Sequence, residues 1–190
     1  MDRDEEYQKH IEVMTADGTV LDPPGFEQLN MWTYILQQLY FTRAQLDKLI
    51  ESKPKLGDMA QITEEYMGFT AFVVTYARCF VSTGARIAKL DATHTFRGEV
   101  YLRKVHDRLM RFRHSSFAHT EQSELMRVRL GVKENSERIT IHHFVTAMTP
   151  RNEFADFKRV VEHVDTQVTL RLNKILLAME QKLGKKIEID

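Results

Sequence analysis

The longest apolar stretch of the chain is the feature that most constrains its fold. Almost every position from Phe69 to Val81 is apolar. A helix that is apolar nearly all round has to be buried, so we predict that this segment belongs to the central helix of a helical domain. The stretch is too short to cross a bilayer and contains Arg78, so we expect no membrane partner. The helically spaced apolar positions of this predicted central helix are Ile62, Met67, Phe69, Phe72, Val73, Tyr76, Phe80 and Val81.

Capping signals and apolar stripes give the remaining helices. Asp58 is the predicted N-cap of the central helix, with Gln61 as its capping-box partner, and Gly84 ends or bends that helix. Three further helices are predicted: residues 26–51, a helix from Glu99, and a helix from Thr149-Pro150 to Gly184. The helix from Glu99 carries one apolar stripe, made of Leu102, Val105, Leu109 and Phe112 at steps of three and four residues. Continuing these steps leads to the polar residues Ser116 and His119.

A period of two replaces the helical period between the last two helices. Apolar and polar residues alternate from Met126 to Lys133, and again around Ile139 and Ile141, with a polar turn at 134–136 between them. This pattern is typical of a β-hairpin. We expect one apolar face to be covered by the domain, and we expect Arg127 and Arg129 to face solvent or a cleft. The expected covered face consists of Met126, Val128, Leu130, Val132, Ile139 and Ile141.

These elements predict a mainly α fold, a four-helix bundle with a β-hairpin inserted before the last helix. The 190 residues suit one domain, which we place at 26–184, followed by a tail at 185–190. Residues 1–25 are harder to interpret and are taken as an N-terminal arm. Within this arm, short apolar segments flank Asp17-Gly18, which is a hairpin-like signal.

Charge and cysteine content restrict the class of protein. The chain has 27 basic and 27 acidic residues, so no global field draws it onto nucleic acid. Its only cysteine, Cys79, excludes an internal disulfide, and its acidic start is unlike a secretory signal. Cytoplasmic location is therefore expected. Basic residues are nevertheless concentrated between Arg97 and Arg129, which is most simply a solvated helix face.

One segment of that basic region carries the side chains for a chemical reaction. It reads Arg113-His114-Ser115-Ser116-Phe117-Ala118-His119. Metal-independent RNA cleavage needs a base for the 2′-hydroxyl, an acid for the 5′-oxygen and a cation for the phosphorane. Histidine titrates near pH ~6.5 and can serve as base or acid. A guanidinium can hold two phosphate oxygens at once.

The bare spacing of an Arg and a His is weak evidence, because it recurs by chance in a chain of this composition. Context distinguishes Arg113/His119, since this pair follows an amphipathic helix and precedes a hairpin and a long helix. On one regular helix the two would lie about 120° apart and ~9 Å along the axis, so a helix break, a long reach by the Arg or a dimer would be needed to join them. Four pairs have an Arg followed by a His after a gap of four to six residues: Arg3/His10, Arg108/His114, Arg113/His119 and Arg138/His143.

The segment from Asp107 to His119 resembles the signature of HEPN (higher eukaryotes and prokaryotes nucleotide-binding) domains, in which an Arg, a polar residue, a short gap and an Ala-His occur late in a helical bundle. The upstream run Thr75-Tyr76-Ala77-Arg78 is similar to the abortive-infection-like members. In helix order the resemblance covers about 26–180, but it is specific over only about 13 residues.

The resemblance implies a homodimer with two motifs facing a shared cleft, and RNA cleavage without metal or cofactor, as in toxin and phage-defence members. A cognate antitoxin would then be a further partner. Carried over, Arg113 and His119 are the catalytic pair, and His114 takes the polar position where Asn or Asp is commoner. Residues expected to contact substrate are Arg78, Arg111, Ser115 and Ser116.

Alternatives remain open at this stage. The same cleft could bind RNA or nucleotide without cutting it, or the motif could only stabilise a structural bundle. Arg78 lies in so apolar a helix that it needs a salt bridge or a cavity, and both are open. Cys79 is expected to be a small core residue. His142 and His143 should point to opposite faces of a strand, and no metal site is predicted.

Overall fold

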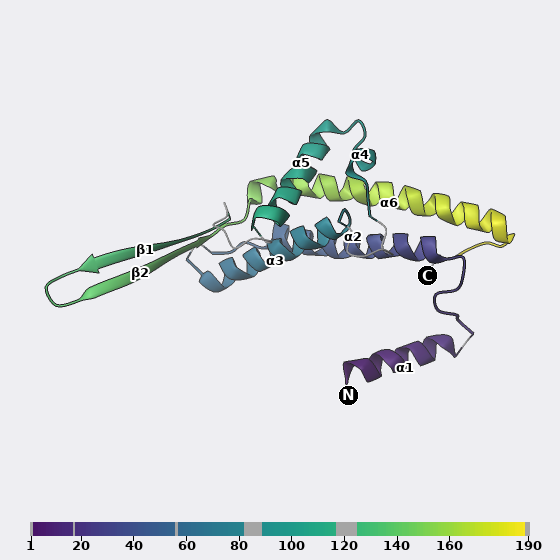
Figure 1. Cartoon of the computed structure of the whole chain (residues 1–190), viewed down its shortest axis with the longest axis horizontal. Helices are drawn as coiled ribbons and strands as arrows, with labels where there is room; N and C mark the ends of the chain where they lie inside the picture. The colour runs from purple at the N-terminus through teal and green to yellow at the C-terminus, as the bar shows by residue number, and fades with distance from the viewer. Residues whose placement is uncertain (1, 17, 56, 82–88, 117–124, 189–190) are drawn as a thin grey trace.

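The computed structural model describes residues 2–16, 18–55, 57–81, 89–116 and 125–188. Over these ranges the chain is mainly helical, with one antiparallel β-hairpin before the last helix, as predicted (Figure 1). Its elements are α1 (Arg3–Thr15), α2 (Glu27–Glu51), α3 (Met59–Arg78), α4 (Ala92–Thr95), α5 (Val100–Arg111), a π-helical turn (Phe112–Ser116), β1 (Met126–Glu134), β2 (Ile139–Ala147), a 3₁₀ turn (Arg151–Glu153) and α6 (Phe154–Leu183).

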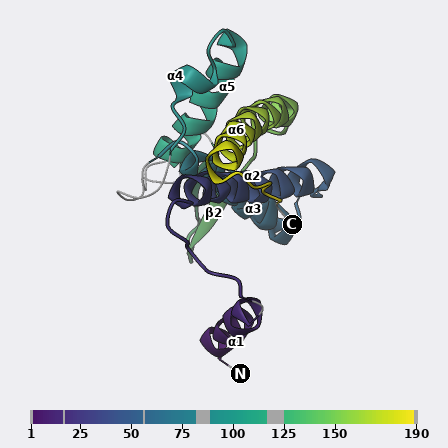
Figure 2. The same cartoon turned by 90° about the vertical axis from the view of Figure 1, so that its right-hand side faces the viewer.

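The core lies between four helices. α2 packs against α3 and α6, and α5 packs against α3 and α6. Figure 1 shows α2 and α6 running side by side while α5 crosses them steeply, and Figure 2 shows α4 and α5 together on one side of the body. Helix α6 is long enough, at 30 residues, to supply one buried residue to every layer of this core. Its buried stripe is Phe154, Phe157, Val160, Val161, Val164, Val168, Leu172 and Ile175.

Helix α3 is the central helix that the sequence predicts. Asp58 is its N-cap, accepting from the backbone N–H of Gln61 at 3.1 Å. The predicted capping box is only half formed, because the Gln61 side chain accepts instead from the backbone N–H of Lys55 at 2.9 Å. The helix ends at Arg78, and Gly84 lies outside the described residues. Phe69 and Phe72 are completely buried, as the apolar pattern requires.

A cluster of phenylalanine rings joins α3 to the end of α5 and the start of α6. The Phe69 ring lies 5.4 Å from Phe112 in an edge-on arrangement and 6.0 Å from Phe154 in a stacked one. Phe157 completes the cluster at 6.1 Å from Phe69. Edge-on and offset-stacked rings at these distances are the favourable aromatic arrangements. The cluster therefore fixes where α5 ends relative to the other helices.

The N-terminal arm differs from the hairpin-like prediction. Residues Arg3–Thr15 form helix α1, none of whose residues is buried. Asp2 and Glu5 form a reciprocal capping box at its start, so the helix satisfies its own first N–H groups locally. A hairpin would have required pairing with a second strand across Asp17, which lies outside the described residues. Figures 1 and 2 show α1 standing apart from the helical body.

The predicted hairpin forms, but its apolar face is not covered. The register pairs Val128 with Val145, Leu130 with His143 and Val132 with Ile141, so the predicted apolar residues do share one face. That face is exposed to solvent, with Leu130 64% and Val132 67% accessible. The reason is geometric: the two strands pair with each other and project from the body, so the described helices reach the hairpin only near its base. Arg127 and Arg129 lie on the opposite, solvent-facing side, as predicted.

An ion pair between half-buried Arg151 and the buried carboxylate of Glu65 fastens the base of the hairpin to the helices. Arg151 pairs with Glu65 of α3, and Thr149 donates to the other oxygen of the same carboxylate. Arg151 also donates to the hydroxyl of Ser52, at 3.3 Å, and to its carbonyl oxygen. Across the strands, the Met148 N–H donates to the Leu125 carbonyl at 2.8 Å.

The start of the last helix is displaced from the prediction by a few residues. Pro150 precedes a 3₁₀ turn rather than opening α6, which begins at Phe154. The turn closes through a bond from the Glu153 N–H to the Pro150 carbonyl at 2.8 Å. At the other end the prediction is confirmed, because Gly184 caps α6 in the left-handed conformation with φ of 63°.

A buried polar pair, Tyr76 with His106, lies in the core. The Tyr76 hydroxyl lies 2.8 Å from His106 Nδ1, and the imidazole is only 3% exposed. Burial raises the pKa of Tyr76 well above 10, so the phenol keeps its proton and donates it to Nδ1. Burial also lowers the pKa of His106 from 6.5 to about 4. The ring is therefore neutral at pH 7, with its own proton on Nε2.

We expect this histidine to make folding sensitive to acid. Its folded-state pKa is lowered, so between about pH 6.5 and 4 only the unfolded chain binds the proton, and stability is lost as pH falls through that window. The contribution is on the order of 3 kcal/mol. Urea unfolding of wild type and His106→Asn at several pH values measures it. The Asn variant keeps an acceptor for Tyr76 without titrating, and its profile should be flatter. Parallel plots of unfolding free energy against pH for the two proteins would contradict the lowered pKa of His106.

Candidate functional site

The motif begins where α5 changes into a π-helical turn. Leu109 and Phe112 are fully buried, and the Phe112 N–H donates to the carbonyls of both Arg108 and Leu109 at the end of α5. The π turn then runs from Phe112 to Ser116. π-helical turns are rare, and they are frequently found at functional sites. Because the turn starts at a buried ring, the following residues leave the core at a fixed point.

Arg108 supports this turn and belongs to the scaffold. Its Nε and Nη2 donate to the two carboxylate oxygens of Glu153, each at 3.2 Å. Its guanidinium also lies 4.2 Å from the centre of the Phe112 ring. A bidentate pair with a cation–π contact is a strong and directional combination. Arg108 therefore ties α5 to the start of α6 and leaves little of its fork for a ligand.

Arg113 and His114 are the first motif side chains to leave the scaffold. Arg113 is half-buried and His114 is exposed. The Arg113 Nη1 lies 3.2 Å from His114 Nδ1. A guanidinium can only donate, so Nδ1 accepts and the ring proton sits on Nε2. The bond to His114 is the interaction that the described residues give the Arg113 guanidinium, and no carboxylate among them pairs with it.

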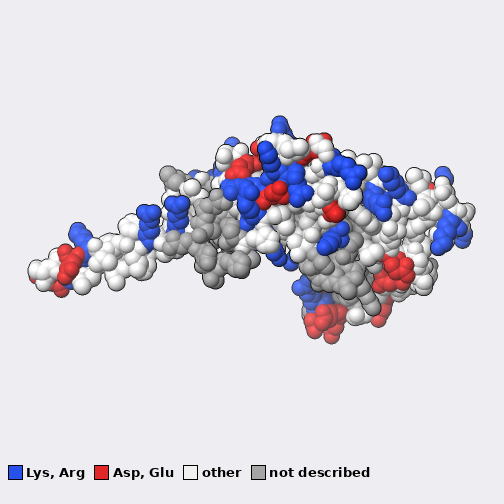
Figure 3. Space-filling model, turned by 45° about the horizontal axis from the view of Figure 1, so that its top comes forward, with Lys and Arg blue, Asp and Glu red and all other residues white. Residues whose placement is uncertain are grey.

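Other basic side chains surround this point. Figure 3 shows Lys and Arg gathered over the α5 region and spaced along the hairpin. Part of the α5 charge is internally paired, with Arg103 bonded to Asp107 at 3.0 Å and Arg108 to Glu153. Arg111, the last residue of α5, is exposed beside the π turn. The basic cluster is thus in part the solvated face that its composition indicates.

Two of the remaining predicted site residues, Ser115 and Ser116, lie within the described chain, and His119 does not. Ser115 and Ser116 complete the backbone of the π turn that carries Arg113 and His114. His119 lies outside the described residues. The structure therefore brings Arg113, His114, Ser115 and Ser116 together in one turn.

Arg78 needs a correction. It is exposed at the last position of α3, so the premise that it is buried in an apolar helix and therefore needs a salt bridge or a cavity is wrong. The apolar run appears continuous in sequence, but the helix ends at this residue. A cation there is favoured by the helix dipole.

The structure also separates the four Arg/His pairs of similar spacing. Arg108 is held by Glu153, which removes Arg108/His114 as a free pair. Arg3 and His10 lie exposed on α1, and Arg138 and His143 lie on the projecting hairpin. Arg113 alone among these arginines follows a buried anchor and lies within a π turn, where it contacts a histidine. This local geometry distinguishes it better than the spacing does.

Sequence reasoning missed the two buried polar centres, Tyr76 with His106 and Glu65 with Arg151. Their signal was present: His106 lies on the apolar stripe of α5, and Glu65 interrupts the apolar pattern of α3. Cys79 is buried as predicted, and burial raises the pKa of its thiol to about 12.

No group of three metal-ligating side chains occurs among the described residues. His142 and His143 point to opposite faces of β2, as predicted. No helix in the described ranges is long and apolar enough to span a bilayer.

No protein-family model, no curated protein and no solved structure matches the chain.

Proposed function

We propose that the chain is a HEPN-like endoribonuclease that cuts RNA without a metal, with Arg113 and His119 as its catalytic pair. The single observation that supports this most is the π turn after α5, which carries Arg113, its fork not engaged by a described carboxylate, next to an imidazole. A role as toxin or phage-defence effector is part of the same proposal. The four-helix bundle is the finer arrangement that goes with it, supported by the packing among α2, α3, α5 and α6.

The proposed reaction is an internal phosphoryl transfer. A base removes the proton of the 2′-hydroxyl, the 2′-oxygen bonds to phosphorus, and the bond to the 5′-oxygen breaks as an acid protonates it. The products are a 2′,3′-cyclic phosphate and a 5′-hydroxyl. Arg113 holds the non-bridging oxygens through two parallel N–H bonds and offsets the charge that grows on them. His119 serves as the base or the acid of this transfer.

His114 takes a positioning role in this scheme. Its Nδ1 accepts from the Arg113 guanidinium, which fixes one edge of the fork and leaves the other edge to the phosphate. While that bond is intact, Nδ1 cannot act as a base, although the Nε2–H can still donate to substrate. Asn, whose side-chain oxygen is also an acceptor, could hold Arg113 in the same way.

A second copy of the chain is the partner we propose for the exposed apolar face of the hairpin. An isolated two-stranded hairpin is at best marginally stable in water, so this face calls for a cover. Its ionisable side chains are limited to Glu134 near the turn and His143 opposite Leu130, and apolar faces of identical chains are self-complementary about a two-fold axis. The same second copy would supply the other motif of the shared cleft.

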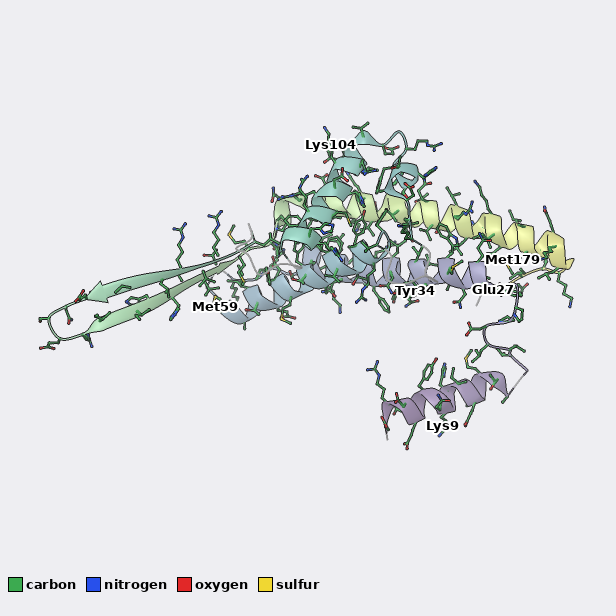
Figure 4. The ribbon with its side chains drawn as sticks, viewed as in Figure 1. Lys9, Glu27, Tyr34, Met59, Lys104 and Met179 are labelled. Atoms are coloured by element: carbon green, nitrogen blue, oxygen red, sulfur yellow. The ribbon has the colours of Figure 1, made fainter. Side chains whose placement is uncertain are left out.

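The size of the surface suits such a dimer if the interface extends beyond the strands. Two nine-residue strands present a face on the order of 300 Å². A stable dimer buries about 800 Å² per partner. At its base the face continues into a cavity of 280 Å³ lined by Ile62, Tyr66, Ala147 and Met148, among others. Figure 4 labels Met59 at the end of α3 nearest the hairpin, and this side chain is also exposed.

The catalytic proposal predicts different defects for the two main variants. His119→Ala should lower cleavage of total RNA by about 10²–10⁴-fold with little change in binding, because proton transfer is lost. Arg113→Ala should weaken both RNA cleavage and RNA binding. Arg113→Lys should recover only part of each, since a point charge cannot replace the planar fork. Cleavage should persist in EDTA. Gel analysis and end-group mapping of the cyclic phosphate measure these outcomes.

The chain supplies its own matched control. Arg3→Ala and His10→Ala remove the same residue types at a similar spacing from the exposed helix α1, and both should cut like wild type. Bound RNA that wild type never cuts would instead indicate the non-cutting binding module. Activity that disappears in EDTA and returns with a divalent metal would contradict both readings.

The positioning role of His114 has its own test. His114→Asn should retain most of the cleavage rate because it preserves an acceptor beside Arg113, whereas His114→Ala should lose a larger part, on the order of 10-fold. Single-turnover rates at saturating RNA separate this loss from weaker binding. Equal losses for Asn and Ala would show that acceptance from Arg113 is not what His114 contributes.

The dimer proposal is tested on the hairpin itself. Leu130→Glu with Val132→Glu places like charges at the proposed contact, so sedimentation at micromolar concentration should give a monomer where wild type gives a dimer. Thr140→Glu with Thr146→Glu adds the same charge on the opposite face and should remain dimeric. A monomeric wild type, or a dimeric Leu130/Val132 variant, would refute the hairpin interface.

A further inference from the structure

The second face of the hairpin differs entirely from the apolar one. The register places Arg127, Arg129 and Lys133 of β1 on the same side as His142 and Phe144 of β2. All five side chains are exposed. Every position of this face belongs to the described strands, and none of them is acidic. Figure 3 shows the basic side chains spaced along the projecting arm.

Phe144 lies on this face in a way that only a glycine permits. A Cβ added at Gly131 would come within 2.7 Å of the Phe144 ring, so the ring rests against the backbone of the neighbouring strand. The side chain is nevertheless 59% exposed, and the His142 ring lies 6.3 Å from it, centre to centre. An aromatic ring held against a strand and open to solvent is a stacking platform.

A hollow connects this platform to the two arginines. It has a volume of 410 Å³ and is lined by Leu125, Arg127, Arg129, Phe144, Thr146 and Met148. This volume falls within the usual size of ligand pockets. Arg127 and Arg129 are two residues apart on one strand, so their backbone positions are separated by ~7 Å, a distance suited to neighbouring phosphates of an extended strand.

We infer that this face, defined by Arg127, Arg129, Lys133, His142 and Phe144, is a binding site for single-stranded RNA outside the cleavage site. A base stacks on Phe144 while Arg127 and Arg129 hold the adjacent phosphates. The exposed ring favours nucleic acid over an acidic peptide or a lipid headgroup, because neither of those presents a flat base to stack. The choice of RNA over DNA rests on the proposed function; the site itself does not.

The site would act as a substrate clamp. The hairpin follows the motif in the chain and is anchored at its base by Arg151 and Glu65, so a strand lying along its basic face can reach both the clamp and the body. A long RNA uses the clamp, whereas a dinucleotide is too short to touch both sites. The clamp therefore affects the KM for long RNA and leaves dinucleotide cleavage unchanged.

The test measures binding without cleavage. A fluorescein-labelled 12-nucleotide single-stranded RNA is titrated by polarisation in EDTA, with every variant built on full-length His119→Ala. Arg127→Ala with Arg129→Ala should weaken binding and lower the salt slope by about 1.4, the value for two phosphate contacts. Phe144→Leu keeps an apolar group over Gly131 but cannot stack, and should weaken binding by about 5- to 100-fold. Phe144→Trp should bind like the parent.

The control variant is Lys9→Ala with Lys104→Ala. It removes the same charge from α1 and from α5, where Figure 4 labels both residues away from the hairpin. It should bind like the parent. Equal losses in the control and the arginine variant, or Phe144→Leu binding like the parent, would overturn the clamp and leave only a general charge effect. Equal loss of binding to anionic phospholipid vesicles in the arginine and Phe144→Leu variants would overturn the choice of RNA.

Failure of the clamp can be told apart from failure of the proposed function. On the catalytically intact background, the hairpin variants should raise the KM for long RNA and leave cleavage of a dinucleotide unchanged. RNA binding that depends on Arg127, Arg129 and Phe144 in a protein that never cuts would support the clamp and refute the nuclease. Cleavage of long RNA that ignores all three side chains would refute the clamp alone.

Discussion

The contact between Phe69 and Phe112 is the interaction on which the rest of the structure depends. Both rings are fully buried, and burial of a phenylalanine contributes about 3 kcal/mol at most. Their importance is positional, because Phe112 is both the last anchor of the α5 stripe and the first residue of the π turn. Arg108 covers the same ring and joins it to α6 through Glu153. A shift at this contact would move every side chain of the motif.

The hairpin adds a second level of organisation. It has one apolar face and one basic, aromatic face, and because of strand pleating, adjacent residues serve different surfaces. The two proposed uses, self-association on one side and RNA binding on the other, therefore draw on different strand residues, although Met148, just past β2, lines the hollow on both sides. Its attachment is polar, through Glu65, Arg151 and Thr149, and is satisfied by mutual hydrogen bonds that offset the cost of burying the carboxylate.

Much of the fold could be predicted because helices and strands leave local periodic signals. The stripes of α2, α3, α5 and α6, the cap at Asp58 and the end at Gly184 all follow from spacing within one element. The failures have equally specific causes. The N-terminal arm became a helix because its capping box is a local option that competes with a hairpin, and Arg78 is exposed because a helix end cannot be located from apolar content alone.

By itself, the sequence determined that α2, α3, α5, α6 and the hairpin form, which face of each is apolar and which segment holds an Arg and a His in close succession. Periodicity and capping are properties of neighbouring residues, so they need no tertiary information. Only the tertiary structure decided that Arg108 is bound to Glu153 while Arg113 contacts His114, since Glu153 approaches from a segment 45 residues away. It alone decided that the hairpin projects with both faces open, because whether an apolar face is covered depends on where the other elements pack.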